Sequence, residues 1–320
     1  MRVDSRSLRQ WMPAALLSVF LLGGASAWAA DDADEKKDIV LTGDAVCTRC
    51  HDEGEAKPVL SIGKTKHGTV ADSRTPTCTS CHGESPTHIN KPEGVAERPA
   101  PDVNFIQGST TPIAERNQAC LNCHQGGKRI HWQTNLHAAR DVACTSCHEV
   151  HTQHDKVRDK QMQAEVCFSC HKEQRAQINR PSRHPIKEGK VACSDCHNPH
   201  GTAGEKMLVR DSVVETCYTC HMEKRGPFVR SHQPVTDDCT ICHNPHGTVN
   251  DNLLKQRSPF LCQQCHEPTG HRGGIPSVVP GTGTSGGGAT LGRGCLNCHT
   301  QIHGSNNPFN DTTTGRALRR

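Results

Sequence analysis

Residues 184–246 read HPIKEGKVACSDCHNPHGTAGEKMLVRDSVVETCYTCHMEKRGPFVRSHQPVTDDCTICHNPH. Every cysteine in this stretch belongs to a Cys-x-x-Cys-His unit, and unattached histidines recur at fixed offsets around the units. His184 and His232 stand shortly before a unit, whereas His200 and His246 stand three residues after one. This repetition indicates a small module that is used several times along the chain.

The same motif accounts for all 20 cysteines of the chain. Random placement of 20 cysteines and 22 histidines in 320 residues would give about 0.09 such units, against ten present. A disulfide scaffold or a set of zinc sites could also use many cysteines, but neither requires a histidine directly after each second cysteine. The units are Cys47/Cys50/His51, Cys78/Cys81/His82, Cys120/Cys123/His124, Cys144/Cys147/His148, Cys167/Cys170/His171, Cys193/Cys196/His197, Cys217/Cys220/His221, Cys239/Cys242/His243, Cys262/Cys265/His266 and Cys295/Cys298/His299.

The spacing within each unit is typical of covalent c-type haem attachment. Two thiols separated by two residues reach the two vinyl groups on one edge of a porphyrin and form thioethers. The adjacent histidine then lies beneath the iron as its first axial ligand. The sequence therefore predicts ten c-type haems, each attached through the two cysteines of a unit, with the histidine of that unit as the proximal iron ligand.

The histidines outside the motifs bear on function, because a haem with both axial positions filled transfers electrons, whereas one with an open position can transform a small molecule. Beyond the first 30 residues only three methionines could compete as second ligands, too few for ten irons. When the even-numbered units are aligned, each has one histidine upstream and one downstream, which predicts bis-histidine ligation throughout and leaves His131 and His154 outside the scheme. The predicted distal ligands are His67, His88, His137, His151, His184, His200, His232, His246, His271 and His303.

Three of these histidines follow a motif histidine by only three residues. Such a segment spans about 10 Å, too little to pass around the macrocycle easily. We therefore expect His151, His200 and His246 to ligate neighbouring haems and to interlock the array. The sequence leaves open which distal histidine pairs with which haem.

The composition is unusual for a chain of this length: 33% hydrophobic residues, a figure that includes the cysteines, and 3% aromatic residues. These side chains are too few to build a core of the usual size, so porphyrin faces are expected to supply it. The predicted fold class is a multihaem cytochrome c, an elongated haem-cored array of short α-helices and irregular loops with almost no β-sheet. The net charge of +4 comes from interspersed charges without a basic aromatic face, which argues against nucleic-acid binding.

The N-terminal residues have the layout of a secretory signal, with Arg2, Arg6 and Arg9 before an apolar run and small residues around Ala27-Trp28-Ala29. Cleavage after Ala29 would leave an exported decahaem array over 30–320. Within the array we assign haems 1–5 to about 44–180 and haems 6–10 to about 181–304, followed by a mobile tail over about 305–320.

Local signals indicate how the modules fold. Ser212 and Glu215 have the spacing of a capping box, which predicts a helix from Val213 that Gly226-Pro227 ends. In the sixth and eighth units the sequence Asn-Pro-His-Gly follows the motif directly, and we expect a turn there because proline ends any helix. A proline-rich connector over 83–119 and a glycine-rich segment over 273–294 are expected to be surface loops.

Four segments closely resemble a known family: CYTCHMEKRGP, HQPVTDDCTICHNPHGTVNDNLLK, FLCQQCH and CLNCHTQIHGSNNP. They are similar to the periplasmic decahaem cytochromes of outer-membrane porin–cytochrome conduits, the MtrA, MtoA and DmsE group. The resemblance is strongest over about 193–307, and the ten units and the chain length agree over the whole mature protein.

The resemblance implies a periplasmic protein that lies within an outer-membrane β-barrel porin and carries electrons without substrate chemistry of its own. Its implied partners are the porin, periplasmic or inner-membrane quinol-linked cytochromes, and an extracellular multihaem cytochrome or reductase. Metal oxides or Fe(II) would be the terminal acceptor or donor, with the direction of flow open. The alternatives are a soluble periplasmic shuttle to a terminal reductase and a multihaem reductase or oxidase enzyme.

Overall fold

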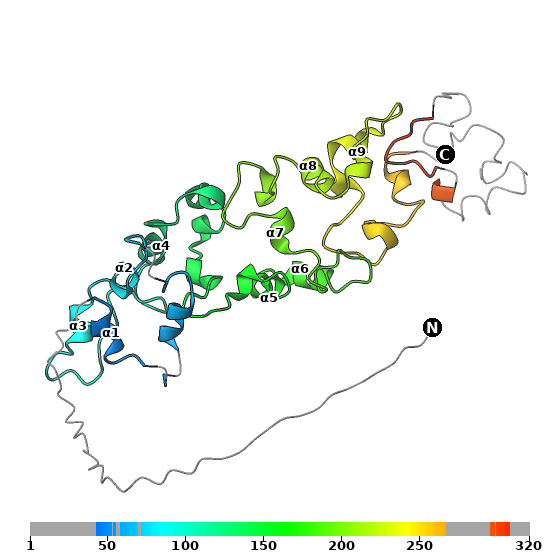
Figure 1. Cartoon of the computed structure of the whole chain (residues 1–320). Helices are drawn as coiled ribbons and strands as arrows, with labels where there is room; N and C mark the ends of the chain where they lie inside the picture. The colour runs from blue at the N-terminus through cyan, green and yellow to red at the C-terminus, as the bar shows by residue number, and fades with distance from the viewer. Residues whose placement is uncertain are drawn as a thin grey trace, which may run out of the picture. The chain divides into compact units, whose positions relative to one another are not determined.

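The structure, a computed structural model, describes residues 43–52, 54–55, 58–69, 72–266, 295–297 and 299–307 (Figure 1). The predicted signal segment, the glycine-rich segment, His271, Cys298 and most of the predicted tail lie outside these residues. The α-helices are α1 (Ala45–Thr48), α2 (Cys78–His82), α3 (Pro86–Ile89), α4 (Ile113–Leu121), α5 (Gln163–Phe168), α6 (Lys172–Gln177), α7 (Cys193–Cys196), α8 (Val213–Tyr218) and α9 (Gln233–Asp237). The 3-10 turns are η1 (Val59–Lys64), η2 (Gly127–Arg129), η3 (Trp132–Thr134), η4 (Ala138–Arg140), η5 (Cys144–Ser146), η6 (Lys156–Arg158), η7 (Glu205–Met207), η8 (Met222–Lys224), η9 (Cys239–Ile241), η10 (Asp251–Leu253), η11 (Cys262–Gln264) and η13 (Cys295–Asn297).

Short helices and loops make up the described part of the chain, which contains isolated β-bridges but no strand or sheet. This agrees with the predicted fold class. None of the described helices is long and apolar enough to cross a membrane.

Helix α8 shows why the helices are short. Ser212 caps it as predicted, since the Ser212 side chain accepts a hydrogen bond from the Glu215 backbone N–H at 3.1 Å. The prediction that this helix continues to Gly226 was wrong, because α8 ends at Tyr218. The motif residue His221 has φ −100° and ψ 51°, outside the helical region, and η8 begins only after it.

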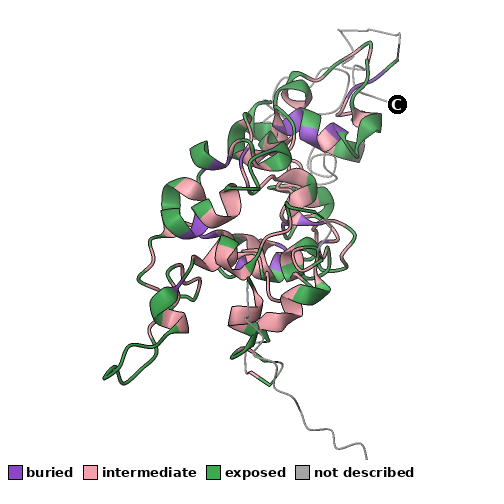
Figure 2. Cartoon of the chain, turned by 60° about the vertical axis from the view of Figure 1, so that its left-hand side comes forward, coloured by how far each residue is buried: buried purple, intermediate pink, exposed green. Residues whose placement is uncertain are grey.

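Few side chains are buried, as Figure 2 shows by its small purple segments among pink and green. Among the described residues no large side chain is less than 2% exposed. The buried apolar cluster consists of Ala164, Phe168, Ile178 and Ile186, with Cys193 packed against it. Buried apolar packing is thus limited to a small cluster beside the motif cysteine Cys193.

Contacts join neighbouring helices and also successive modules. Helix α5 packs on α6, and α8 packs on α9 (Figure 1). Isolated antiparallel bridges pair Ser182 with Thr248 and Arg230 with Ser305, so each links the segment before one even-numbered unit to the segment after a later one. The modules therefore interlock through residues more than 60 positions apart in sequence.

The connector over 83–119 is more structured than the predicted surface loop. It contains α3 and the start of α4, and its Val103 and Pro99 carbonyls lie 2.9 and 2.7 Å from the Nδ1 atoms of His82 and His88. These contacts give the part-buried Nδ1 atoms of His82 and His88 the hydrogen-bond partners that polar groups need away from water.

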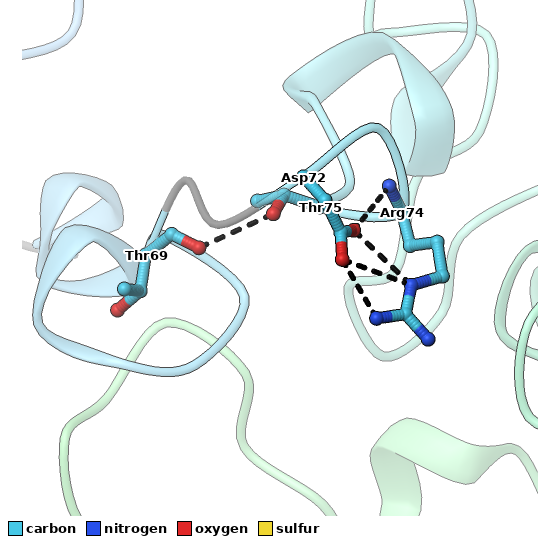
Figure 3. Close-up of polar contacts among 4 residues, drawn as sticks. All are labelled: Thr69, Asp72, Arg74 and Thr75. Atoms are coloured by element: carbon cyan, nitrogen blue, oxygen red, sulfur yellow. Dashed lines mark hydrogen bonds and ion pairs between the residues drawn. The ribbon is translucent and has the colours of Figure 1, made fainter.

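The turn that leads into α2 is held by exposed polar contacts (Figure 3). The Arg74 guanidinium donates to both Asp72 oxygens, and the Thr75 hydroxyl donates to the Thr69 carbonyl at 3.2 Å. The hydrogen bond from Arg74 is the main cause that lowers the pKa of the Asp72 carboxyl. These contacts close the loop between His67 and Cys78.

Candidate haem-attachment sites

Each of the nine motifs that the structure describes in full folds as one helical turn. The backbone N–H of the motif histidine donates to the carbonyl of the first cysteine, for example at 2.9 Å from His124 to Cys120 and at 3.0 Å from His171 to Cys167. Residues at positions i, i+3 and i+4 share one face of such a turn, so the two thiols and the imidazole lie on the same side. This is the arrangement that thioether attachment beside a proximal ligand requires.

The Asn-Pro-His-Gly turns form as predicted after the sixth and eighth motifs. In the second of them the Gly247 N–H donates to the Asn244 carbonyl at 3.2 Å, and the His246 N–H donates to the Asn244 side chain at 3.1 Å. Gly247 has φ +142°, and a Cβ placed there would lie 2.3 Å from the Gln177 carbonyl oxygen. Only glycine fits this turn, which holds His246 against an earlier module.

The structure brings the histidines together in pairs. Each pair joins one motif histidine to one of the predicted distal histidines, with ring centroids 5.8–6.3 Å apart. The tenth predicted pair would require His271, which lies outside the described residues. The nine pairs are His51–His88, His82–His151, His124–His67, His148–His200, His171–His137, His197–His246, His221–His184, His243–His303 and His266–His232.

The pairing follows one rule along the chain. The histidine of an even-numbered unit faces the lone histidine that follows the unit two places later, as His197 faces His246. The histidine of an odd-numbered unit faces the lone histidine that precedes the unit before it, as His221 faces His184. The first unit departs from the rule, because His51 faces His88. In these pairs the histidine three residues after a motif therefore faces a different unit from its own.

The ring spacing fits one iron between two imidazoles. A metal–nitrogen bond of about 2 Å on each side, plus about 1 Å from each nitrogen to its ring centre, separates two such centroids by about 6 Å. In direct van der Waals stacking the two rings would lie closer together than this. The residues present thus fit a haem iron held from both faces.

The second ring nitrogen has a hydrogen-bond partner in nine of the eighteen paired histidines. The Nδ1 atoms of His137 and His184 lie 2.8 and 2.7 Å from the carbonyls of Pro199 and Pro245, the prolines of the two Asn-Pro-His turns. An imidazole that donates from Nδ1 presents the lone pair of Nε2, the state in which protein histidines bind metals. The other Nδ1 partners are Glu55 for His51, Val103 for His82, Pro99 for His88, Asp155 for His148, Val59 for His151, Lys206 for His197 and Asn252 for His243.

Burial favours the neutral form of several of these rings. It lowers the pKa of His200 to about 4, with the charge of His148 as the next cause. Burial is also the largest cause that lowers the pKa of His246 and of His303. A neutral imidazole is the form that coordinates a metal.

The thiols of successive units lie beside one another. The first cysteine of an odd-numbered unit adjoins the first cysteine of the next unit, as Cys120 adjoins Cys144 and Cys167 adjoins Cys193, and each thiol of these pairs shifts the pKa of the other. In further pairs of adjoining thiols, one thiol raises the pKa of the other. They are Cys47 with Cys78, Cys81 with Cys120 and Cys123, Cys147 with Cys170, Cys196 with Cys220, Cys217 with Cys239, Cys242 with Cys265, and Cys262 with Cys295. The attachment points therefore adjoin in the order of the sequence.

Cys50, in the first unit, differs from the second cysteines of the later odd-numbered units. The sequence predicts the same role for all ten units, and the structure places Cys50 in the motif turn, where its N–H donates to the Cys47 carbonyl at 3.1 Å. The second cysteine of each later odd-numbered unit adjoins a thiol of the unit before it, but no unit precedes the first. Cys50 is exposed and does not belong to the thiol neighbours found in the described part of the chain. Its attachment to a haem stays a prediction from the motif.

His299, in the tenth unit, is described without its predicted partner. Its N–H donates to the Cys295 carbonyl at 2.9 Å, the same hydrogen bond that the motif histidines of the other units make. His271, the lone histidine before this unit, and Cys298, the second cysteine of the unit, both lie outside the described residues. The nine observed ring pairs therefore do not include His299, and its role as a proximal ligand stays a prediction.

His131 and His154 remain outside the ring pairs, and the hydrogen-bond partners of the Nδ1 atoms were not predicted from the sequence. Neither His131 nor His154 belongs to a ring pair among the described residues, and the His154 Nε2 lies 3.2 Å from Asp159. The Nδ1 partners escaped sequence reasoning, because most are backbone carbonyls that any residue type can supply. The carboxylates of Glu55, Asp155 and Glu223, the last of which lies 3.5 Å from Nδ1 of His221, do carry a residue-type signal.

The single-turn Cys-x-x-Cys-His motifs, the adjoining thiols and the paired imidazoles define a multihaem c-type cytochrome. Comparison with known proteins agrees with this class. The doubled CXXCH motif family matches residues 184–226 and 232–271, and the family of cytochrome c-type proteins similar to NrfB matches residues 78–163. The chain is 43% identical over 280 residues to the multiheme cytochrome MtrA of Shewanella baltica, covering 86% of this chain and 80% of that protein.

Two further relatives are cytochrome c-type proteins NrfB. The Escherichia coli O6:H1 protein is 31% identical over 54% of this chain and 92% of its own length, and the Haemophilus influenzae protein is 29% identical over 40% of this chain and 64% of its own length. The chain belongs to the MtrA family of multihaem cytochromes, and it is an electron-transfer protein.

Proposed function

We propose that the chain is a decahaem conduit that carries electrons across the outer membrane within a β-barrel porin. It would connect periplasmic or inner-membrane quinol-linked cytochromes with extracellular acceptors or donors, such as metal oxides or Fe(II). The series of nine imidazole pairs carries this proposal, because it offers two axial ligands at each of nine successive units.

The residues have separate roles in this proposal. The cysteines of the ten units hold the cofactors covalently, and the motif histidines bind the irons from one side. The distal histidines predicted from the sequence bind from the other side, with His271 assigned to His299 of the tenth unit. When bound, the haems supply reversible one-electron chemistry.

The adjoining thiols favour a continuous electron-transfer path and not a set of isolated haems. Neighbouring units share thiol contacts from Cys47 in the first unit to Cys295 in the tenth. A chain that holds its cofactors side by side in sequence order can accept an electron at one end and release it at the other. With both axial positions filled, such a chain has no open coordination position for substrate chemistry, so we propose that it is not an enzyme.

The location is proposed on the same basis. We propose export by the signal over residues 1–29 and residence in the periplasm in association with a porin. The family membership supports this assignment. Large outer-membrane β-barrels are also wide enough to enclose a protein plug.

A protease-protection experiment tests the conduit. Cells that produce the native protein are converted to spheroplasts and treated with protease, and the haem-stained band is followed on gels with and without detergent. The conduit predicts protection that detergent removes, together with co-purification of an outer-membrane β-barrel protein. Complete digestion without detergent and purification alone would instead favour a soluble periplasmic shuttle.

A further inference from the structure

The four even-numbered units within the described residues allow an internal comparison at one atom, Nδ1 of the motif histidine. In three of them a backbone carbonyl lies 2.8–2.9 Å from this atom: Val103 for His82, Lys206 for His197 and Asn252 for His243. In the fourth unit the partner is the side-chain oxygen Oδ2 of Asp155, at 2.8 Å from His148. A neutral partner is thus replaced by an anion at one position of the repeat.

Asp155 is held in place for this contact. Its side chain is only 14% exposed, and its other oxygen accepts the Glu149 backbone N–H at 3.3 Å. In the described part of the chain no lysine or arginine forms an ion pair with Asp155 that would neutralise it. The neighbouring Lys156 instead pairs with Glu149 at 3.7 Å. The negative charge is therefore directed at His148.

The opposite ring of this pair has a different environment. Nδ1 of His200 is buried without a hydrogen-bond partner, whereas Nδ1 of the corresponding His151, which faces the second unit, lies 2.7 Å from the Val59 carbonyl. The His200 ring also packs against the buried Trp132, with centroids 6.2 Å apart. Of the two rings, only His148 is polarised by an anion.

We infer that Asp155 is a positioning residue that sets the reduction potential of the fourth haem below those of the other even-numbered haems. The inference rests on the proposed function, because it requires His148 as an iron ligand. A carboxylate that accepts the Nδ1–H proton makes the imidazole a stronger electron donor and stabilises Fe(III) over Fe(II). Its fixed negative charge acts in the same direction.

The test uses the full-length, haem-loaded protein and redox titration followed by visible absorbance. Asp155→Asn keeps the size of the side chain and removes the charge. The expected result is that one haem in ten becomes easier to reduce, by about tenfold in its one-electron equilibrium constant, which corresponds to about 59 mV. Asp155→Glu, which retains the carboxylate, should lie closer to the unmodified protein.

Asp159→Asn is the matched control, because Asp159 is four residues away and faces His154, which belongs to no ring pair among the described residues. Its titration should superimpose on that of the unmodified protein. An unchanged curve for Asp155→Asn, or equal shifts in Asp155→Asn and Asp159→Asn, would overturn the inference. The second outcome would mean that any nearby charge acts through space.

A second site keeps the test informative if Asp155→Asn does not retain its haem. Glu55 oxygens lie 3.0 Å from Nδ1 of His51, the corresponding contact in the first unit. Glu55→Gln should shift one haem in the same direction but less, because Glu55 is 34% exposed and solvent screens its charge. An unchanged or lowered potential would contradict the inference. High-spin haem in the unmodified protein would instead contradict the proposed histidine ligands themselves.

Discussion

Replacing His246 by alanine should make one haem in ten high-spin, and that haem should belong to the sixth unit and not to the eighth. His246 follows the eighth motif by three residues, but its ring centroid lies 6.2 Å from that of His197 in the sixth. The turn is fixed there, since Thr248 bridges to Ser182 and Gly247 touches Gln177. The expected high-spin signal in electron paramagnetic resonance (EPR) is thus about one-tenth of the total haem, since one of the ten predicted irons loses a ligand.

Two triple variants assign the signal to a unit. Adding Cys193→Ala and Cys196→Ala removes the sixth haem, and the high-spin signal of His246→Ala should disappear with it. Adding Cys239→Ala and Cys242→Ala removes the eighth haem, and the signal should persist. The opposite outcome would show that His246 binds the iron of its own unit and would refute the interlocked pairing.

Three other predictions address the turn, the ring planes and the cofactor. Gly247→Ala should lower the free energy of unfolding of the haem-loaded protein by about 2–3 kcal/mol, because a strained φ adds to a backbone clash. The control is Gly94→Ala, at φ +81° with open space around its Cβ. Equal losses of stability for the two variants in denaturant titrations would contradict the clash at Gly247. The His67–His124 and His137–His171 planes cross at 84° and 77°, so these two haems should give the most anisotropic low-spin EPR signals, and their absence would count against these pairs. The chain made without haem should lack cooperative thermal unfolding in circular dichroism, because so few apolar side chains are buried, whereas a sharp transition would show that the side chains suffice.

The repeat made much of the site predictable. The thiol and histidine types within each motif are dictated by attachment chemistry, and the offsets of His184, His200, His232 and His246 repeat with the module. The same reasoning gave the fold class, because a chain with so few aromatic and aliphatic residues cannot build a conventional core.

The pairing could not be predicted, because it depends on how one module packs on the next. His246 faces His197 through a turn that contacts Gln177, and no local pattern encodes that long-range contact. The end of α8 at Tyr218 was missed for a related reason. Capping signals mark where a helix can begin and stop, whereas the backbone of His221 leaves the helix earlier, within the motif.

The most direct test of the account counts haems and their ligands together in the oxidised, full-length protein. Mass spectrometry should find ten covalently attached haems on the exported chain, and quantitative EPR should assign all ten to low-spin iron with two histidine ligands. Fewer than ten haems, or one high-spin haem per chain, would contradict the claim that paired histidines fill both axial positions along the whole chain.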